Sequence, residues 1–174
     1  MSELVTRIAA VEGVTAFEGE DDLARGCQHQ YNAPSAAIRN VAQCFREAGY
    51  HLEHASCLDL RTDDGGGMRL VYQFNRHGAP DRHLVLIDLV SDAHGTSIRD
   101  IFAGADWYER EIYDMHGVVI DGHPDLRRLL MPENYTGHPL LKDFRDEDAQ
   151  REVFAAPMPA EEVAADGEDA GANA

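Results

Sequence analysis

The spacing of apolar side chains predicts one well-defined helix in the first third of the chain. Four apolar residues within 34–48 recur at i, i+3, i+4 and i+7, which places them on one stripe of an α-helix. Pro34 suits the first helical turn, and Gly49 suits the C-terminal cap. The stripe comprises Ile38, Val41, Ala42 and Phe45.

Three strand candidates follow this helix. Residues 50–60 are irregular, residues 68–75 alternate apolar with polar side chains, and residues 83–90 are almost entirely apolar. The breaks at 63–67 (Asp-Asp-Gly-Gly-Gly) and 77–80 (His-Gly-Ala-Pro) have the composition of turns. Because connections this short join antiparallel neighbours, we expect an α+β fold in which the helix packs on a mostly antiparallel sheet.

Two short helices are predicted beyond the strands, at residues 97–102 and 106–115. Asp106 with Glu109 three residues later has the pattern of a capping box, which would start the second helix. Periodicity is then lost, although Gly, Pro, His and Arg remain frequent. A long irregular segment in a compact domain is usually functional.

The chain therefore divides into four parts. We expect an N-terminal helix and strand segment at 1–33, an α+β domain at 34–116, and an extended interaction arm at 117–145. The remainder, 146–174, is rich in Ala, Glu and Asp. Low hydrophobicity with high charge predicts disorder there.

Composition narrows the functional classes. The net charge of -17, of which residues 146–174 contribute -8, argues against nucleic acid as a partner. The three cysteines are widely spaced with no C-x-x-C pair, which predicts reduced thiols and no iron–sulfur or zinc-ribbon site. No stretch approaches the ~20 apolar residues that cross a bilayer, so partners would have to hold the chain at a membrane.

Residues 106–144 carry most of the candidate chemistry. The predicted helix sets Trp107 and two tyrosines beside four charged residues, a composition typical of interface hot spots. A solvated amphipathic helix is the alternative, in which Arg110 and Asp114 could pair at i, i+4. A basic island follows, for which an acidic patch on a partner or the chain's own Asp125 and Asp143 would provide counter-charges. The island comprises Arg127, Arg128, Lys142 and Arg145.

The turn Gly-His-Pro occurs twice, at 122–124 and 137–139. Gly permits an unusual φ before each His and Pro fixes the chain after it, so each imidazole points in a defined direction. One hypothesis is a free-standing metal-binding module formed by His116, His123 and His138. The spacing of these histidines is unlike that of usual zinc ligands, so hydrogen-bonded turn histidines are the simpler interpretation, and no metal ligand is predicted.

Catalysis finds little support in the sequence. The chain lacks G-x-S-x-G, Walker and G-x-G-x-x-G motifs. An acid–base pair among Glu109, Glu111 and Asp114 is a further hypothesis, but it requires a substrate pocket that no pattern marks. No catalytic or cofactor-binding residue is therefore predicted.

Residues 106–144 closely resemble the thirty-kilodalton subunit family of the respiratory-chain NADH dehydrogenase, that is, the C subunit of complex I. This family includes homologous subunits of energy-converting membrane-bound NiFe hydrogenases. The resemblance rests on an ordered series of motifs, and the pattern of residues 34–105 fits the α+β domain of that family. The motifs are Trp107–Glu111, Tyr113–Met115, Gly117, Gly122–Leu130, Pro132, Gly137–Leu140 and Lys142–Phe144.

The resemblance implies a non-catalytic, cofactor-free accessory subunit of an oxidoreductase complex. Iron–sulfur clusters, and flavin or a nickel-iron centre, would lie in partner subunits. The partners implied are a large quinone-site or hydrogenase-like subunit and a cluster-bearing small subunit, at the cytoplasmic face of the prokaryotic inner membrane. The resemblance assigns an interface role to Trp107, Glu109, Arg110, Glu111, Asp114, His123, Arg127, Arg128, His138 and Lys142.

The sequence departs from the usual motifs at three places. His116 stands where Phe is common, Leu141 where Arg is common, and Arg145-Asp146 where Pro-Leu usually follows. These departures leave two branches open. One is complex I, with electron transfer coupled to proton translocation, and the other is a formate- or CO-linked, hydrogen-evolving membrane hydrogenase.

Overall fold

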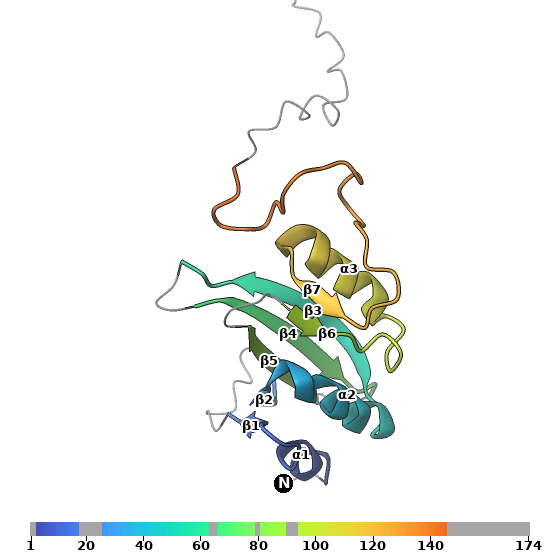
Figure 1. Ribbon diagram of the computed structural model, residues 1–174. Helices are drawn as coiled ribbons and strands as arrows, with labels where there is room; N and C mark the ends of the chain where they lie inside the picture. The colour runs from blue at the N-terminus through green and yellow to red at the C-terminus, as the bar shows by residue number, and fades with distance from the viewer. Residues whose placement is uncertain (1–2, 18–25, 63–65, 79–80, 90–93, 146–174) are drawn as a thin grey trace, which may run out of the picture.

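A computed structural model describes residues 3–17, 26–62, 66–78, 81–89 and 94–145. It shows an α+β fold in which helices and a small second sheet accompany one larger sheet (Figure 1). The elements are α1 (Glu3–Ala9), β1 (Thr15–Ala16), β2 (His29–Asn32), η2 (Ser35–Ala37), α2 (Ile38–Glu47), β3 (His51–Asp59), β4 (Met68–Asn75), β5 (Arg82–Leu89), β6 (His94–Thr96), α3 (Ala105–His116) and β7 (Val119–Asp121).

The larger sheet has the strand order β1-β2-β5-β4-β3. The predicted meander is confirmed, because β3, β4 and β5 pair antiparallel in sequence order. Strand β2, which the sequence pattern did not reveal, joins the far edge parallel to β5. Strands β6 and β7 form a separate parallel pair.

One face of the larger sheet carries the core. Along β4 every second side chain is buried, as the alternation of residues 68–75 predicts. Phe45 of α2 stacks on Phe74 of β4 at a ring-centroid distance of 4.2 Å, and Phe102 contacts Phe74 from the other side at 5.5 Å. Burying each such side chain contributes about 1.5–3 kcal/mol, so this aromatic cluster fixes α2 on the sheet.

Helix α2 ends as its sequence predicts. Gly49 has φ of 80°, a left-handed conformation that glycine adopts without steric cost. The backbone N–H of Gly49 donates to Arg46 and that of Tyr50 donates to Phe45. These bonds satisfy the last carbonyls of the helix and turn the chain into β3.

The helix predicted at 97–102 is wrong. The segment forms a single turn, in which the N–H groups of Ile101 and Phe102 both donate to the carbonyl of Ile98. The predicted capping box is also wrong, since the N-cap residue of α3 is Gly104 and no side chain caps the helix. The Glu109 carboxylate binds a different segment, as described below, and that tertiary contact outweighs the local pattern.

The N-terminal segment contains a helix and a short strand. Helix α1 buries Leu4 and Ile8, and the short strand β1 lies within the apolar segment that follows. At the other end, β7 occupies the first residues of the predicted arm. The acidic tail 146–174 lies outside the described residues. No described helix is both long enough and apolar enough to cross a membrane.

Candidate subunit interface: helix α3 and the arm

Helix α3 is anchored across β3. The hydroxyl of Tyr108 donates to the backbone carbonyl of Glu53 on β3 at 3.0 Å, and Ile112 and Met115 are buried beneath the helix. The helix ends at Gly117, whose φ of 73° turns the chain toward β7. Residues 117–145, called the arm here, then return over α3 (Figure 1).

The carboxylate of Asp114 holds the middle of the arm. Its side chain is fully inaccessible to solvent. One oxygen, Oδ2, accepts the consecutive backbone N–H groups of residues 129–131 at 2.7–2.9 Å, and Oδ1 accepts Arg128 Nη1 at 2.7 Å. Successive N–H groups that converge on one anion form a strong, directional binding site.

These donors offset two costs of placing a carboxylate at this position. Burial acts to raise the pKa of Asp114, but the N–H groups of residues 129–131 and the Arg128 guanidinium outweigh burial and lower the pKa below its ordinary value. A negative charge in the last turn of a helix also opposes the helix dipole. The four hydrogen bonds therefore make the ionised form of Asp114 the stable one.

Further bonds bind the arm to α3 on either side of this carboxylate. Arg110 donates to the carbonyls of Arg127 and Arg128, at 3.2 and 2.9 Å. His138 Nδ1 donates to the Asp114 carbonyl at 2.9 Å, and the N–H of Leu140 donates to the Met115 carbonyl at 3.0 Å. The Arg110–Asp114 pair suggested by their spacing does not form, because both side chains bind the arm.

A second buried carboxylate fixes the end of the arm to the sheet. The side chain of Asp59, at the end of β3, is only 3% exposed. It accepts the backbone N–H of Lys142 at 2.9 Å and a bidentate pair from Arg61. Arg61 also binds Asp143 at 2.6 Å. Sequence reasoning missed Asp59, although it occupies the same face of the strand as Ala55 and Cys57 and is therefore an acid at a core-facing position.

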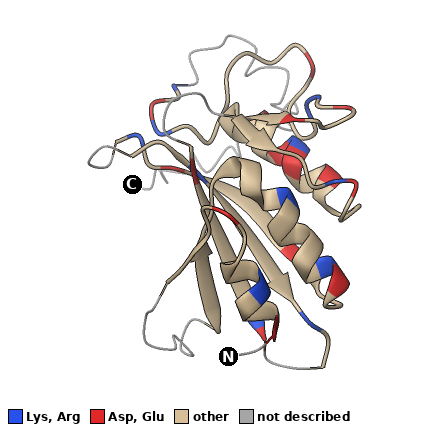
Figure 2. Ribbon diagram, turned by 60° about the horizontal axis from the view of Figure 1, so that its bottom comes forward, with Lys and Arg blue, Asp and Glu red and all other residues tan. Residues whose placement is uncertain are grey.

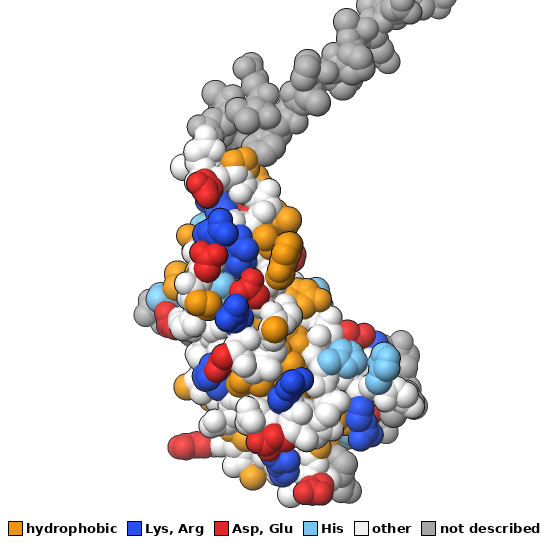
Figure 3. Space-filling model, turned by 90° about the vertical axis from the view of Figure 1, so that its right-hand side faces the viewer, with side chains coloured by type: hydrophobic (Ala, Val, Ile, Leu, Met, Phe, Trp, Pro, Cys, Tyr) orange, Lys and Arg blue, Asp and Glu red, His pale blue; other side chains and the backbone are white. Residues whose placement is uncertain are grey.

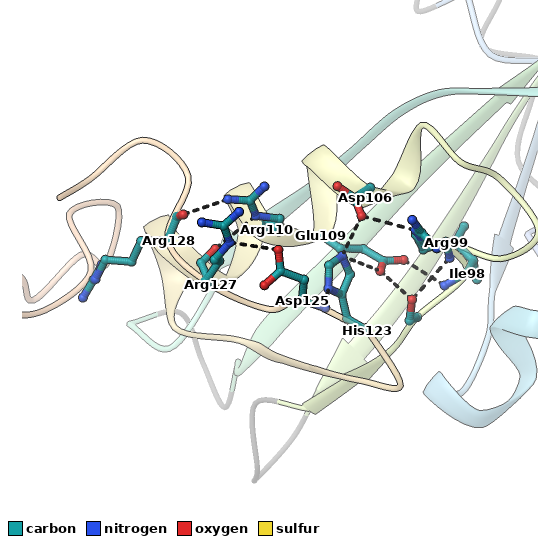
Figure 4. Close-up of polar contacts among 10 residues, drawn as sticks. Ile98, Arg99, Asp106, Glu109, Arg110, His123, Asp125, Arg127 and Arg128 are labelled. Carbon is teal, nitrogen blue, oxygen red and sulfur yellow. Dashed lines mark hydrogen bonds and ion pairs between the residues drawn. The ribbon is translucent and has the colours of Figure 1, made fainter. Parts of the chain in front are cut away.

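A third polar cluster joins α3 to its neighbours (Figure 4). The buried Glu109 carboxylate accepts the Ser97 hydroxyl at 2.6 Å and the Ile98 N–H at 2.8 Å. Burial is the main reason that the pKa of Glu109 is raised. The fully buried His123 side chain places Nε2 within 3.5 Å of Asp106 and 3.9 Å of Glu109.

The hydrogen bonds of His123 define its tautomer. The N–H of Asp125 donates to His123 Nδ1 at 3.1 Å, so Nδ1 carries no proton and Nε2–H faces the two carboxylates. The first Gly-His-Pro turn is thus seated against the start of α3. The second turn is seated against its end through His138. Both agree with the interpretation of hydrogen-bonded turn histidines.

The basic island is satisfied largely within the chain. Arg127 pairs with Asp125 at 2.8 Å, as anticipated, whereas Arg128 pairs with Asp114. Asp143 pairs with Arg61, which lies outside the island. Lys142 Nζ donates to the hydroxyl of Thr62 at 3.0 Å.

Other residues of the motif region face outward. Trp107, in the first turn of α3, is 66% exposed. Figure 2 shows charged residues on the outer side of the helices, and Figure 3 shows hydrophobic and basic side chains close together along the arm. Tryptophan is among the residues most enriched at the hot spots of protein interfaces. The exposed set comprises Trp107, Glu111, Arg127, Leu130, Leu140 and Lys142.

In the part of the chain that the structure describes, the geometry supports neither the three-histidine metal site nor the acid–base pair. Among the described residues, His116, His123 and His138 do not bring ligand atoms together. Glu109 and Asp114 are consumed by bonds to the chain itself. Two surface cavities, of about 400 and about 360 Å³, involve neither of these carboxylates nor Glu111.

Comparison with known proteins identifies the family. A family model described as respiratory-chain NADH dehydrogenase, 30 kDa subunit, matches residues 31–150. The match extends over more than half of the chain and includes the α+β domain and the arm. The chain belongs to this family.

Curated relatives agree with this assignment. The C subunit of NADH-quinone oxidoreductase from Rhodopseudomonas palustris is 50% identical over 70 residues, which is 36% of this chain and 34% of the relative. The same subunit from Rhodobacter capsulatus is 39% identical over 97 residues, 51% of this chain and 49% of the relative. The matched part of the chain thus spans between a third and a half of the length of these relatives.

Two solved structures share the fold. A trypsin-resistant fragment of Nqo5 matches with a TM-score of 0.58 at 21% identity, covering 70% of this chain and 96% of the fragment. A chain of the membrane-bound sulfane sulfur reductase, an archaeal respiratory membrane complex, matches with a TM-score of 0.65 at 21% identity, covering 87% of both chains.

Proposed function

We propose that the chain is an accessory and assembly subunit in the peripheral arm of NADH:quinone oxidoreductase (complex I). In this role it docks on the large quinone-site subunit and on the cluster-bearing small subunit, at the cytoplasmic face of the prokaryotic inner membrane. It supports electron transfer coupled to proton translocation without carrying a redox group. The family membership shown above supports this proposal.

The docking proposal rests on a difference among the motif residues: some bind other parts of this chain, and others are exposed to solvent. The side chains of Asp114, Glu109 and Arg128 form hydrogen bonds within the chain. These bonds hold α3 and the arm in one rigid arrangement. Trp107 and Arg127 remain 66% and 61% exposed. A pre-ordered surface with aromatic and arginine anchors binds a partner at low entropic cost.

The ten motif residues therefore have two proposed roles. Those directed inward position the surface, and those directed outward contact the partner. The inward group comprises Glu109, Arg110, Asp114, His123, Arg128 and His138. The outward group comprises Trp107, Glu111, Arg127 and Lys142.

Co-purification from gently solubilised native membranes tests this proposal. The parent chain should carry along a large subunit and a cluster-bearing small subunit, identified by mass spectrometry. Changing Trp107→Ala together with Arg127→Ala should reduce the recovered partners about tenfold or more, since one hot-spot residue contributes about 2 kcal/mol or more.

Phe17→Ala is the matched control, because Phe17 is a 60% exposed aromatic residue at the opposite end of the fold. It should leave recovery unchanged. Full recovery and normal activity of a complex that contains the Trp107 and Arg127 double variant would refute the docking proposal. A parent chain that brings down no stable partner would refute the assembly role itself.

A hydrogenase-branch subunit is the second candidate. It is favoured by the departures at His116 and Leu141, which lie at the end of α3 and in the arm, where His116 is buried and Leu141 packs against the core. The same co-purification distinguishes the branches. A flavoprotein among the partners indicates complex I, whereas a large subunit with nickel-ligand C-x-x-C pairs indicates an energy-converting NiFe hydrogenase.

A further inference from the structure

Three potential metal ligands lie close together at one end of the larger sheet. Asp59, which binds the arm, lies at the other end. The parallel register of β2 and β5 pairs His29 with His83, and their rings lie 4.7 Å apart. Asp81 immediately precedes β5. One donor atom from each of the three side chains lies within 4.8 Å of the other two. Elements distant in sequence thus bring two imidazoles and one carboxylate together.

Neighbouring side chains hold two of these ligands in place. His83 is 1% exposed, with Nδ1 3.2 Å from the Tyr31 hydroxyl and Nε2 3.0 Å from Asp81 Oδ1. The second oxygen of Asp81 accepts the Tyr50 hydroxyl and Arg76 Nη2. Ligands whose far atoms are fixed by hydrogen bonds are the usual arrangement around protein-bound metals.

The separations fit a metal ion after a small adjustment. An ion that binds N and O donors at about 2.0–2.2 Å sets them roughly 3–3.5 Å apart. His83 and Asp81 are already at 3.0 Å. His29 is half-buried, so its ring can rotate toward the other two. A surface cavity lined in part by Tyr50 and Arg76 reaches Asp81, one of the three ligands.

We propose that His29, Asp81 and His83 form a binding site for one divalent transition-metal ion of the zinc class. Two imidazole nitrogens and one carboxylate oxygen suit Zn²⁺, Co²⁺ or Ni²⁺ better than Mg²⁺ or Ca²⁺, which prefer all-oxygen sites. Three protein ligands leave a fourth position open for water. The site is separate from the α3 and arm surface and does not depend on its proposed function.

Metal binding would leave the number of protons on the His83 imidazole unchanged. An ionised Asp81 carboxylate can only accept a hydrogen bond, so in the metal-free chain a neutral His83 donates Nε2–H to Asp81 while its Nδ1 accepts from the Tyr31 hydroxyl. The metal takes the Nε2 lone pair, so the imidazole proton moves to Nδ1 and is donated to the Tyr31 oxygen. A tyrosine hydroxyl can serve as donor or acceptor, and the imidazole remains neutral throughout.

The test uses the full chain without a histidine tag, freed of metal by chelator and titrated with Zn²⁺ calorimetrically. We expect one ion per chain, retained through gel filtration and counted by elemental mass spectrometry. His29→Ala and, separately, Asp81→Asn should each weaken Zn²⁺ binding tenfold or more. Co²⁺ should give the visible absorption of a four-coordinate N/O site that both variants lose.

His51→Ala is the matched control, because His51 is exposed and lies 6.0 Å from the ring of His77, a pair that could bind metal adventitiously. It should leave the affinity unchanged. Absence of a retained ion would overturn the proposal, as would equal affinity in Asp81→Asn and the parent chain. Loss of binding in His51→Ala would place the ion at the surface pair instead. Circular dichroism verifies that each variant is folded. If His29→Ala does not fold, the Zn²⁺ affinity of Asp81→Asn alone tests the proposal.

Discussion

Two regions of the molecule use ion pairs in opposite ways. At α3 and the arm, the carboxylates of Asp114 and Asp59 are 0% and 3% exposed and accept backbone N–H groups as well as guanidinium groups. On the outer face of the larger sheet, Asp88 pairs with Arg69 at 2.5 Å but is 53% exposed. The surface pair is at least as short as either buried one, so distance does not distinguish the two regions.

Burial and partner type make the difference. Water can replace either member of the Arg69–Asp88 pair, so the pair contributes little. Loss of Asp114 would leave three consecutive N–H groups without an acceptor inside the protein. It would also remove the counter-charge of Arg128, whose guanidinium would keep only backbone carbonyls as acceptors. Both changes carry a large desolvation penalty. The buried carboxylates therefore define the path of the arm.

The largest effect is expected from Asp114→Ala. Removing this acceptor should lower the free energy of unfolding by about 3–5 kcal/mol, as for other buried charge pairs broken on one side. The arm should detach from α3 before the sheet unfolds. Urea denaturation of the purified chain gives the loss of stability, and limited proteolysis locates the first cleavage within residues 126–141.

Asp125→Ala is the control for this change. Asp125 pairs with Arg127 at 2.8 Å on the surface of the same arm, and it should leave both stability and the cleavage pattern unaltered. If the two variants behaved alike, burial would not be the property that gives Asp114 its role.

Asp59→Asn should have the next largest effect, about 1.5–3 kcal/mol at pH 7, because it weakens charged hydrogen bonds to Arg61 and Lys142. The side-chain bonds from Arg61 are the main cause that lowers the pKa of Asp59, and the Lys142 N–H contributes. A carboxylate with a lowered folded-state pKa stabilises the fold above its ordinary value of 3.8. That stabilisation is lost as pH falls below this value.

The pH dependence of the stability difference between the parent and Asp59→Asn chains reports on Asp59 alone. Urea denaturation of parent and Asp59→Asn chains should show a stability difference that is greatest near neutrality and shrinks as pH falls below the ordinary pKa of 3.8. A difference that stays constant over that range would show that the Asp59 charge does not hold the arm. Other carboxylates titrate in both chains, so their contributions cancel in the difference.

The elements predicted from the sequence are those in which the pattern of apolar side chains indicates which positions are buried. Helix α2 and strand β4 have apolar positions at the period of the element, β5 is almost entirely apolar, and turn-forming residues separate these strands from each other and from β3. Their predicted bounds lie close to those in the structure. Strand β2 was not predicted, since His29–Asn32 contains only one buried side chain, Tyr31, and therefore shows no apolar alternation. Its parallel neighbour β5 begins at Arg82, after two further strands, which is beyond the reach of a local pattern.

The site shows the same limit. The motif residues could be located from the sequence, but the direction in which each side chain points could not. Glu109 fits a capping box by spacing, yet Ser97 and the Ile98 N–H bind it in the folded chain. An acid at a core-facing strand position, as at Asp59, was the available signal for a buried clamp, because such a group requires internal partners.

A smaller effect is expected from Gly117→Ala. An alanine at φ of 73° costs about 1–2 kcal/mol, and its Cβ would lie 2.7 Å from His138 Cδ2. The imidazole must then move away from the Asp114 carbonyl. Gly49→Ala is the matched control, because φ is 80° there and no atom lies within 4 Å of the added Cβ. Urea denaturation should show the greater loss for Gly117→Ala, and equal losses would mean that the His138 contact contributes nothing.

The smallest effect should come from the outer face of the sheet. Arg69→Ala removes the partner of Asp88, and the free energy of unfolding should fall by about 0.5 kcal/mol or less, the usual range for exposed pairs. Because salt screens such pairs, the difference between variant and parent should vanish in about 1 M NaCl. Urea denaturation at low and high salt measures both quantities. A salt-independent loss as large as that of Asp59→Asn would show that the outer face relies on its charges as the arm does, and the contrast between the two regions would fail.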